Sequence, residues 1–222
     1  MLERVLEPEL MDDPEEAQAY DDMDHEGVNK AFVQDFLQVA EGAAEILDLG
    51  TGTARIPIEL CRSDEECRVL ASDAAVSMLE VAKINVAIEG FEGRILLHHG
   101  DSKQLDLADD MFDAVISNSL LHHLPEPRSA VDEMVRVVRP AGWLFVRDLL
   151  RPESAEQVEE LVTTYAGQET DYSKQLFRQS LVAALSLDEI RTMVGEAGFD
   201  PSTVQQTTDR HWTWAASKPT AE

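Results

Sequence analysis

Basic residues are scarce in this sequence. Only 18 of its 222 residues are Lys or Arg, against 44 Asp or Glu, which gives a formal net charge of −26. Such a chain repels phosphate backbones and lacks the cations whose counterion release stabilises nucleic-acid complexes. We therefore expect no nucleic-acid partner, and the acidity fits a halotolerant or merely very soluble protein equally well.

Cysteines and long apolar runs are also few. Cys61 and Cys67 have no neighbouring Cys/His pair, so neither a zinc knuckle nor a disulfide framework is indicated, and both should be reduced thiols. No uninterrupted apolar run approaches the roughly 20 residues that a membrane helix needs. The acidic N-terminus lacks the basic start and apolar block of a signal peptide. We expect a cytoplasmic protein without a membrane partner.

The length of 222 residues suits one domain with a modest appendage. Residues 1–30 contain eleven Asp or Glu, a composition typical of an exposed, partly irregular arm. A solvated tail is one interpretation of this arm. Tyr20 and His25 favour another, in which the arm is a lid over a site. The remaining residues, 31–222, would form the folded domain.

Apolar periodicity predicts an α/β fold. From Val28 to Val39 the apolar residues recur with a helical period, which indicates a helix with one buried face. Short apolar runs then alternate with helical stretches, an order that favours a mainly parallel sheet covered on both faces. The expected strands are residues 44–50, 68–73, 94–100, 112–119 and 142–150, and the expected helices are 53–62, 75–90 and 129–138, the last stopped by Pro140.

The pattern changes beyond Pro152. Residues 153–197 are predicted to be helical, and Ser186 and Glu189 form a candidate capping box within this segment. Two short strand candidates follow, residues 202–208 and 211–217, separated by a tight connection. They are expected to form a terminal hairpin on the sheet.

A glycine-rich turn joins the first expected strand to the next helix. In Asp48-Leu49-Gly50-Thr51-Gly52, the glycines permit tight turning and close approach of a ligand to the backbone. Asp73 ends the second strand about twenty residues later, where a carboxylate can accept both hydroxyl hydrogens of a ribose. Arg55 stands where a dinucleotide fingerprint has its third glycine, and no cationic cluster accompanies the turn. These features favour a nucleoside without phosphate, although Asp73 as a helix cap remains an alternative.

Polar residues also follow the third and fourth expected strands. Asp101 and Ser102 come after the third strand, where a carboxylate can accept a hydrogen from an adenine amino group or simply cap a loop. Asn118, His122 and His123 follow the fourth strand. Ligands of such sheets bind at the carboxyl ends of the strands. Either histidine is a candidate catalytic base or a structural residue.

Taken in order, these motifs resemble those of the class I S-adenosylmethionine-dependent methyltransferases. The similarity rests on ILDLGTGTA (46–54), Asp73 with Met78, Gly100-Asp101-Ser102, and FDAVISNSLLHHLPEP followed by VRVVRPAGWLFVRD. It covers about residues 44–150 and is greatest to the quinone-biosynthesis-like branch. The resemblance implies a Rossmann-like, seven-stranded, mostly parallel sheet with helices on both faces and a C-terminal antiparallel hairpin.

The resemblance also implies a cofactor, S-adenosyl-L-methionine, and residues that bind it. By analogy, the turn of Asp48, Gly50, Thr51 and Gly52 would pack on the methionine part and Asp73 would hold the ribose. The remaining cofactor contacts implied are Met78 against the adenine, Asp101 and Ser102 at its border, and Asn118 near the methionine moiety. Ala54 departs from the family, which often has a third glycine there. The arm and residues 153–185 would cover the substrate.

The chemistry expected is in-line transfer of a methyl group to a small-molecule O, N, S or C nucleophile, in which positioning and water exclusion matter most. An acidic oxygen or carbon acceptor needs a base, for which His122, His123, His25 and Asp148 are candidates. Arg147 and Arg178 are candidates for binding a substrate carboxylate, or for surface salt bridges.

No metal site is expected, because the histidines are not arranged with carboxylates at ligand spacing. Three rival functions remain: an RNA methyltransferase, which needs a basic groove, a catalytically silent cofactor-binding or scaffold protein, and a nicotinamide-dependent oxidoreductase. The acceptor and the oligomeric state, monomer or homodimer, stay open.

Overall fold

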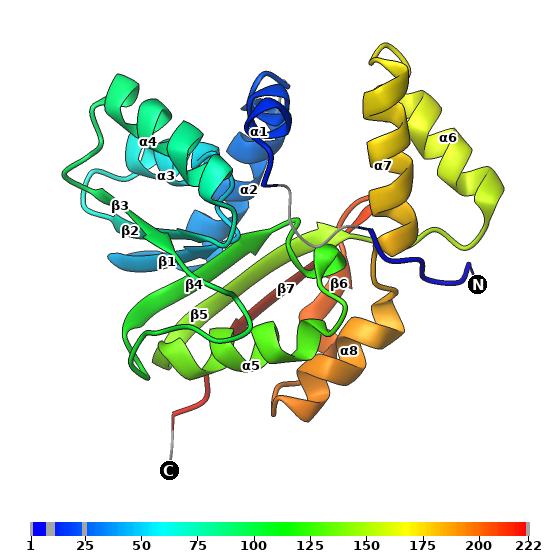
Figure 1. Ribbon diagram of the computed structural model, residues 1–222. Helices are drawn as coiled ribbons and strands as arrows, with labels where there is room; N and C mark the ends of the chain where they lie inside the picture. The colour runs from blue at the N-terminus through cyan, green and yellow to red at the C-terminus, as the bar shows by residue number, and fades with distance from the viewer. Residues whose placement is uncertain (1, 8–11, 24–25, 221–222) are drawn as a thin grey trace.

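A computed structural model describes residues 2–7, 12–23 and 26–220 of the chain. They form a seven-stranded sheet of order β3-β2-β1-β4-β5-β7-β6, in which only β7 runs antiparallel to its neighbours (Figure 1). The strands are β1 (Glu45–Leu49), β2 (Arg68–Asp73), β3 (Ile95–His99), β4 (Phe112–Asn118), β5 (Val138–Leu149), β6 (Val204–Gln206) and β7 (His211–Ser217). The expected Rossmann-like sheet with its C-terminal hairpin is confirmed.

Helices cover both faces of the sheet. In Figure 1, α1 to α4 lie on one face, α5 and α8 on the other, and α6 with α7 stand beyond the ends of β4 and β5. The helices are α1 (Pro14–Asp21), α2 (Glu26–Val39), α3 (Arg55–Ser63), α4 (Val76–Glu89), α5 (Pro127–Val137), α6 (Ala155–Ala166), α7 (Asp171–Ala183) and α8 (Leu187–Glu196), with short 3-10 turns η1 (Leu121–His123) and η2 (Pro201–Thr203).

Each face of the sheet has its own apolar core. On the α2 and α3 face, the ring of Phe145 meets Phe32 edge-on at 5.1 Å and Phe36 at 5.8 Å. On the α5 and α8 face, Trp214 packs edge-on against Phe199 at 5.3 Å. Both faces of β1, β4 and β5 are therefore buried, as expected of central parallel strands.

Two local predictions need correction. The helix before Pro140 ends at Val137, and β5 begins at once with Val138, so this proline lies in the strand. The pairing of β4 with β5 is irregular there: Val138 faces Phe112, and regular register resumes only at Trp143. A proline, which has no N–H to donate, is tolerated at such an irregularity.

The second correction concerns the arm, which is more ordered than its composition suggested. Asp13 caps α1, its Oδ1 accepting the N–H groups of Glu15 and Glu16 at 2.8 and 3.2 Å, and Pro14 occupies the first helical turn. These are ordinary helix-start signals, concealed in an acidic run. α2 also begins at Glu26, so residue 30 lies inside a helix.

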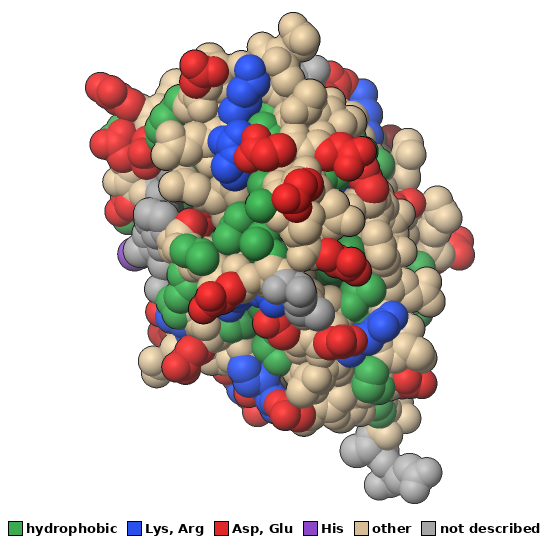
Figure 2. Space-filling model, turned by 90° about the vertical axis from the view of Figure 1, so that its right-hand side faces the viewer, with side chains coloured by type: hydrophobic (Ala, Val, Ile, Leu, Met, Phe, Trp, Pro, Cys, Tyr) green, Lys and Arg blue, Asp and Glu red, His purple; other side chains and the backbone are tan. Residues whose placement is uncertain are grey.

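On one side of the molecule the charged residues of both signs are interspersed. Figure 2 shows the side of the molecule that carries α6 and α7, where Lys and Arg side chains are interspersed with Asp and Glu. Among the residues that the structure describes, no helix is both long enough and apolar enough to cross a membrane. The two cysteines are free and buried, as expected.

Candidate functional site

The glycine turn follows β1 at the carboxyl edge of the sheet. Gly50 and Gly52 adopt left-handed conformations, with φ of 76° and 55°, and a Cβ built on Gly50 would lie 2.9 Å from a Leu120 methyl carbon. The N–H groups of Gly50 and Thr51 both donate to the Ser72 carbonyl, at 2.9 and 3.0 Å. The turn is therefore fixed to β2, and glycine is needed at both positions.

Ala54 stands where the resemblance implied a third glycine. It lies immediately before α3 with a φ of 62°, a left-handed backbone that glycine adopts without strain. Its side chain is fully buried. The alanine thus keeps the turn at a local conformational cost.

Two carboxylates lie beside this turn. Asp48 is buried, accepts a 2.6 Å hydrogen bond from the Thr51 hydroxyl, and has its pKa raised to about 7 by burial. At the end of β2, Asp73 accepts the Gly52 N–H at 2.8 Å through Oδ2 and the Ala75 N–H at 2.9 Å through Oδ1. Burial raises the pKa of Asp73, although these hydrogen bonds oppose the rise.

The acidic pair fits a nucleoside better than a phosphate. Each carboxylate oxygen has more than one acceptor site, so Asp73 can still receive two ribose hydroxyls besides its backbone donors. Arg55, the cation nearest in sequence, is bound by both carboxylate oxygens of Asp21 at 2.8 and 2.5 Å. Arg55 is therefore already paired with Asp21, and the Asp48 and Asp73 carboxylates disfavour binding of a pyrophosphate.

The other predicted cofactor residues lie along the same edge. Met78 is nearly buried in α4, Ser102 is buried, and Asn118 is half-buried at the end of β4. Asp101 is exposed and accepts the Lys103 N–H at 2.9 Å, which is the loop-capping role that the sequence left open. The structure therefore brings these residues to the strand ends without testing their contact with a cofactor.

α1 of the arm covers the glycine turn. A Cβ built on Gly52 would lie 3.8 Å from the Tyr20 ring, and Tyr20 packs together with Met78 and the fully buried Ala17. Burial raises the pKa of the Tyr20 hydroxyl, and the Asp73 charge adds to the rise. Asp12 accepts the Ser77 N–H at the start of α4 at 2.9 Å. His25, the other proposed lid residue, lies outside the described residues.

The two predicted catalytic histidines occupy η1, immediately after β4. His122 is buried; its Nδ1 lies 2.5 Å from Oδ1 of Asp148 in β5, and its backbone N–H donates to Oδ2 of the same carboxylate. His123 is partly exposed, and its ring stacks on that of His122 with centroids 4.1 Å apart. The fold therefore gives one of the two histidines an orienting carboxylate.

Glu7 of the arm reaches both histidines and was missed by sequence reasoning. Its Oε1 lies 3.3 Å from His122 Nε2 and 3.0 Å from His123 Nδ1. Burial opposes ionisation of Glu7, but the two histidine hydrogen bonds lower its pKa to about 2. Burial alone would lower the pKa of His122, yet Asp148 and then Glu7 raise it to about 9. One glutamate among eleven acidic residues of the arm gave no distinguishing signal.

The two arginines proposed to bind substrate have protein partners. Arg147 is almost buried, donates to Thr213 at 2.9 Å and to Asp35 at 2.7 Å, and lies over the Phe32 ring. Arg178 on α7 pairs with Glu159 of α6. Arg178 thus makes the surface salt bridge that was the alternative for it, whereas the ion pair of Arg147 involves a buried guanidinium. Substrate binding by either arginine stays a prediction.

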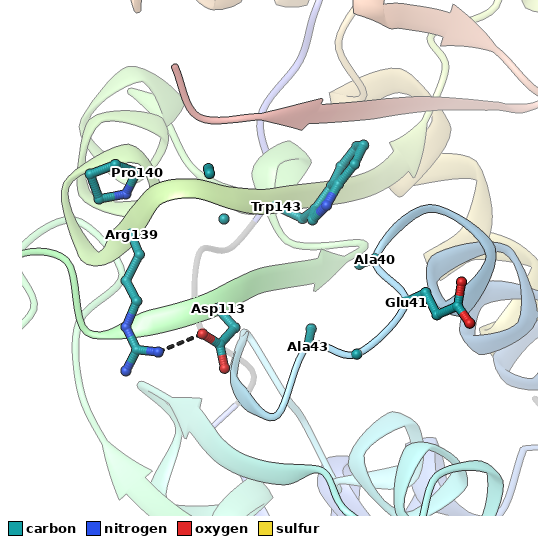
Figure 3. Close-up of a pocket in the computed structure, with 10 residues that line it drawn as sticks. Ala40, Glu41, Ala43, Asp113, Arg139, Pro140 and Trp143 are labelled. Atoms are coloured by element: carbon teal, nitrogen blue, oxygen red, sulfur yellow. Dashed lines mark hydrogen bonds and ion pairs between the residues drawn. The ribbon is translucent and has the colours of Figure 1, made fainter. Parts of the chain in front are cut away.

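A cavity lies at the opposite edge of the sheet. It is an open pocket of about 240 Å³ between the end of α2 and the starts of β4 and β5. Figure 3 shows Arg139 and Asp113, joined by an ion pair, on one side and Trp143 and Ala40 on the other. Ligands of parallel α/β sheets bind at the carboxyl ends of the strands, so this cavity is remote from the predicted site.

Comparisons with known proteins agree with the geometry. A family described as a methyltransferase domain matches residues 47–146. The chain is 28% identical over 179 residues to the 27-O-demethylrifamycin SV methyltransferase of Amycolatopsis mediterranei, covering 78% of this chain and 61% of that protein. It is 30% identical to the demethylmenaquinone methyltransferase of Desulfitobacterium hafniense, covering 57% of this chain and 51% of that protein. The chain thus spans somewhat over half of each relative.

Solved structures share the whole fold. A SAM-dependent methyltransferase from Aquifex aeolicus superimposes with a TM-score of 0.66 at 19% identity, covering 92% of this chain and 98% of that one. At this identity the likeness concerns the fold alone. The superposition covers far more of the chain than residues 47–146.

Proposed function

Because a methyltransferase-domain family matches residues 47–146 and the chain is similar to demethylmenaquinone methyltransferases, we propose that it is a class I S-adenosylmethionine-dependent methyltransferase of the quinone-biosynthesis-like branch. It would transfer the methyl group of S-adenosylmethionine to a small-molecule acceptor. The observation that carries the proposal is Asp73, fixed at the end of β2 by the N–H groups of Gly52 and Ala75. It lies where a ribose would meet the glycine turn.

Different residues at this edge of the sheet are assigned to different parts of the cofactor. We assign the ribose to Asp73, the adenine to Met78 with Asp101 and Ser102, and the methionine part to the turn with Asn118. S-adenosylmethionine supplies an electrophilic methyl carbon on a sulfonium. The protein's part is to hold an acceptor atom in line with that carbon and to exclude water. Tyr20 and α1, which already cover the turn, are suited to the second task.

We assign proton removal from an oxygen or acidic carbon acceptor to His122, with His123 beside it. Asp148 accepts from Nδ1, so the hydrogen of neutral His122 lies on Nδ1 and the lone pair of Nε2 is available. This tautomer fixation is what a carboxylate does for a catalytic histidine. Glu7 occupies the space next to Nε2. An acceptor bound there would displace Glu7 and remove one of the two charges that favour protonated His122.

The setting of the reaction follows from composition and burial. A chain of net charge −26 favours a small acceptor over nucleic acid. Free, buried Cys61 and Cys67 are consistent with a reducing cytoplasm. We propose a cytoplasmic enzyme that acts as a monomer or homodimer, with the arm and residues 153–185 over the substrate. Product formation separates this function from that of a silent cofactor-binding protein.

S-adenosylmethionine and S-adenosylhomocysteine are both expected to raise the melting temperature. A ligand that binds only the native state adds about 2.7 kcal/mol of stability at a hundred times its Kd. Differential scanning fluorimetry with each compound, and with NAD⁺ as the control, measures the shift. Methyl-labelled cofactor and a metabolite extract, analysed by mass spectrometry, then identify the acceptor. Indifference to both compounds would contradict the proposed function.

Tyr20→Ala is expected to weaken S-adenosylmethionine binding about two- to tenfold, because an aromatic contact contributes about 0.5–1.5 kcal/mol beyond its buried area. Tyr20→Phe, which keeps the ring, is the matched control and should bind nearly as well as the wild type. Isothermal titration calorimetry distinguishes them. Equal affinities for wild type and Tyr20→Ala would show that α1 does not cover the cofactor.

A further inference from the structure

A second property of the η1 region arises from three side chains that converge in a nearly closed space. Glu7 Oε1, His122 Nε2 and His123 Nδ1 all lie within 4.8 Å of one another. The side chain of His122 is 3% exposed, that of Glu7 7% and that of His123 27%. Two imidazole nitrogens and one carboxylate oxygen thus face a common point.

The ligand atoms are held by a second layer of contacts. Asp148 accepts from His122 Nδ1 at 2.5 Å, which leaves Nε2 facing Glu7. Nε2 donates a hydrogen to Glu7 when His122 is protonated and offers a lone pair when it is neutral. The Ser180 hydroxyl lies within hydrogen-bond distance of both Glu7 oxygens, 3.1 Å from Oε2 and 3.3 Å from Oε1. Oε1 is the oxygen that contacts both histidines. Histidines that bind metals usually donate their other ring nitrogen to a carboxylate or carbonyl, as His122 does here.

The distances suit a small ion. Nitrogen and oxygen ligands about 2.0–2.2 Å from a tetrahedral Zn²⁺ are about 3.3–3.6 Å apart. Glu7 Oε1 is 3.3 Å from His122 Nε2 and 3.0 Å from His123 Nδ1. Both Glu7 contacts are thus within a few tenths of an ångström of the separations in a coordination shell, and the two histidine nitrogens lie within 4.8 Å of each other.

The charges of the cluster also favour a bound metal ion. Glu7 and Asp148 place two carboxylates in a nearly closed space around the two imidazoles. The nearby Arg4 guanidinium donates to the carbonyls of Ala183, at 2.6 Å, and of His122, at 3.1 Å. The carboxylate charges can be balanced by a proton on each imidazole or by one divalent cation.

We propose that Glu7, His122 and His123 bind one divalent transition-metal ion of the Zn²⁺ class, with a fourth position open to water. Imidazole ligands favour Zn²⁺ and its neighbours over Mg²⁺ or Ca²⁺, which prefer oxygen. Because Glu7 is on the arm and the histidines follow β4, the ion fastens residues 2–7 to the carboxyl edge of the sheet. The site stands on its own geometry and does not rest on the proposed function. Nε2 of His122 cannot accept a proton while it binds the ion, so the base assigned to His122 acts only in the metal-free chain.

Titration of the metal-free full chain with Zn²⁺ and with Co²⁺ tests the site. Calorimetry should give one ion per chain, and Co²⁺ should develop the visible absorption of a low-coordinate nitrogen-ligated ion. Glu7→Gln and His123→Ala should each weaken binding by at least the tenfold to hundredfold typical of losing even an outer-shell partner. Glu3→Gln, the same substitution at an exposed position of the same arm, should bind as the wild type does. Mg²⁺ should not bind.

Nitrogen NMR of the wild-type histidines gives a readout that needs no variant. Zn²⁺ should shift two of the six histidines, and they should be His122 and His123. Equal affinity of wild type and Glu7→Gln, shifts at other histidines, or no binding at all would overturn the proposal and leave a protonated ion-pair cluster. Adding S-adenosylmethionine to the same samples reports the cofactor site separately, so failure of one proposal is distinguishable from failure of the other.

Discussion

Replacement of His122 by asparagine is expected to slow methyl transfer to an oxygen acceptor by about 100- to 10,000-fold, the usual contribution of a positioned general base. Asparagine retains a polar side chain near Asp148 but has no ring nitrogen to receive the acceptor's proton. S-adenosylmethionine affinity should change little, because His122 is not among the residues assigned to the cofactor and its ring nitrogens face Asp148 and Glu7 instead. Single-turnover rates with saturating cofactor, beside calorimetric affinities, measure both quantities.

His123→Asn is the matched control for this experiment. Its ring stacks on that of His122 and is partly exposed, but Asp148 orients only His122. Loss of His123 should therefore cost less than loss of His122. Partial rescue of His122→Asn by added imidazole would separate a missing base from a disturbed fold. An unchanged rate in His122→Asn would mean that the acceptor is a thiolate or amine that needs no base, and the assignment would be wrong.

Local sequence signals predicted the fold well because each acts over a few residues. The apolar period from Val28 to Val39 predicted α2, and the capping box of Ser186 and Glu189 marked the start of α8. The signal at Asp13 and Pro14 was equally local but was outweighed by the acidity around it. Pro140 misled because a proline that stops a helix can also lie in an irregular strand.

Contacts at the candidate site were predictable only between residues of neighbouring motifs in the sequence. The contact of Asp73 with the glycine turn was predictable because the crossover connection of a parallel sheet fixes their spacing, whereas their contact with a cofactor stays a prediction. The pairing of Glu7 with His122, by contrast, joins the arm to η1, and that of Arg147 with Asp35 spans 112 residues. No period or cap encodes such pairs. They arise from how α1, α2 and α7 pack, which the sequence alone does not specify.

Asp73→Ala is expected to weaken S-adenosylmethionine binding about ten- to a hundredfold. Hydrogen bonds to a charged group contribute about 1.5–3 kcal/mol, and each 1.4 kcal/mol is about tenfold in affinity. The Asp73 carboxylate is held by Gly52 and Ala75 at 2.8 and 2.9 Å, so it is oriented before a ligand arrives. Asp73→Asn should also lose affinity, since its amide offers one acceptor oxygen and no charge.

Asp73 also makes the contact expected of its alternative role, a cap for α4. Its Oδ1 accepts the N–H of Ala75, the residue before α4, and Ala75 itself provides no side-chain cap. If capping is the only role, Asp73→Asn should behave like the wild type and Asp73→Ala should mainly lower the melting temperature, by the equivalent of about 1 kcal/mol. If Asp73 holds the ribose, both variants lose affinity whatever happens to their stability. Calorimetric titration beside a melting curve separates the two roles, and intact affinity in both variants would place the ribose elsewhere.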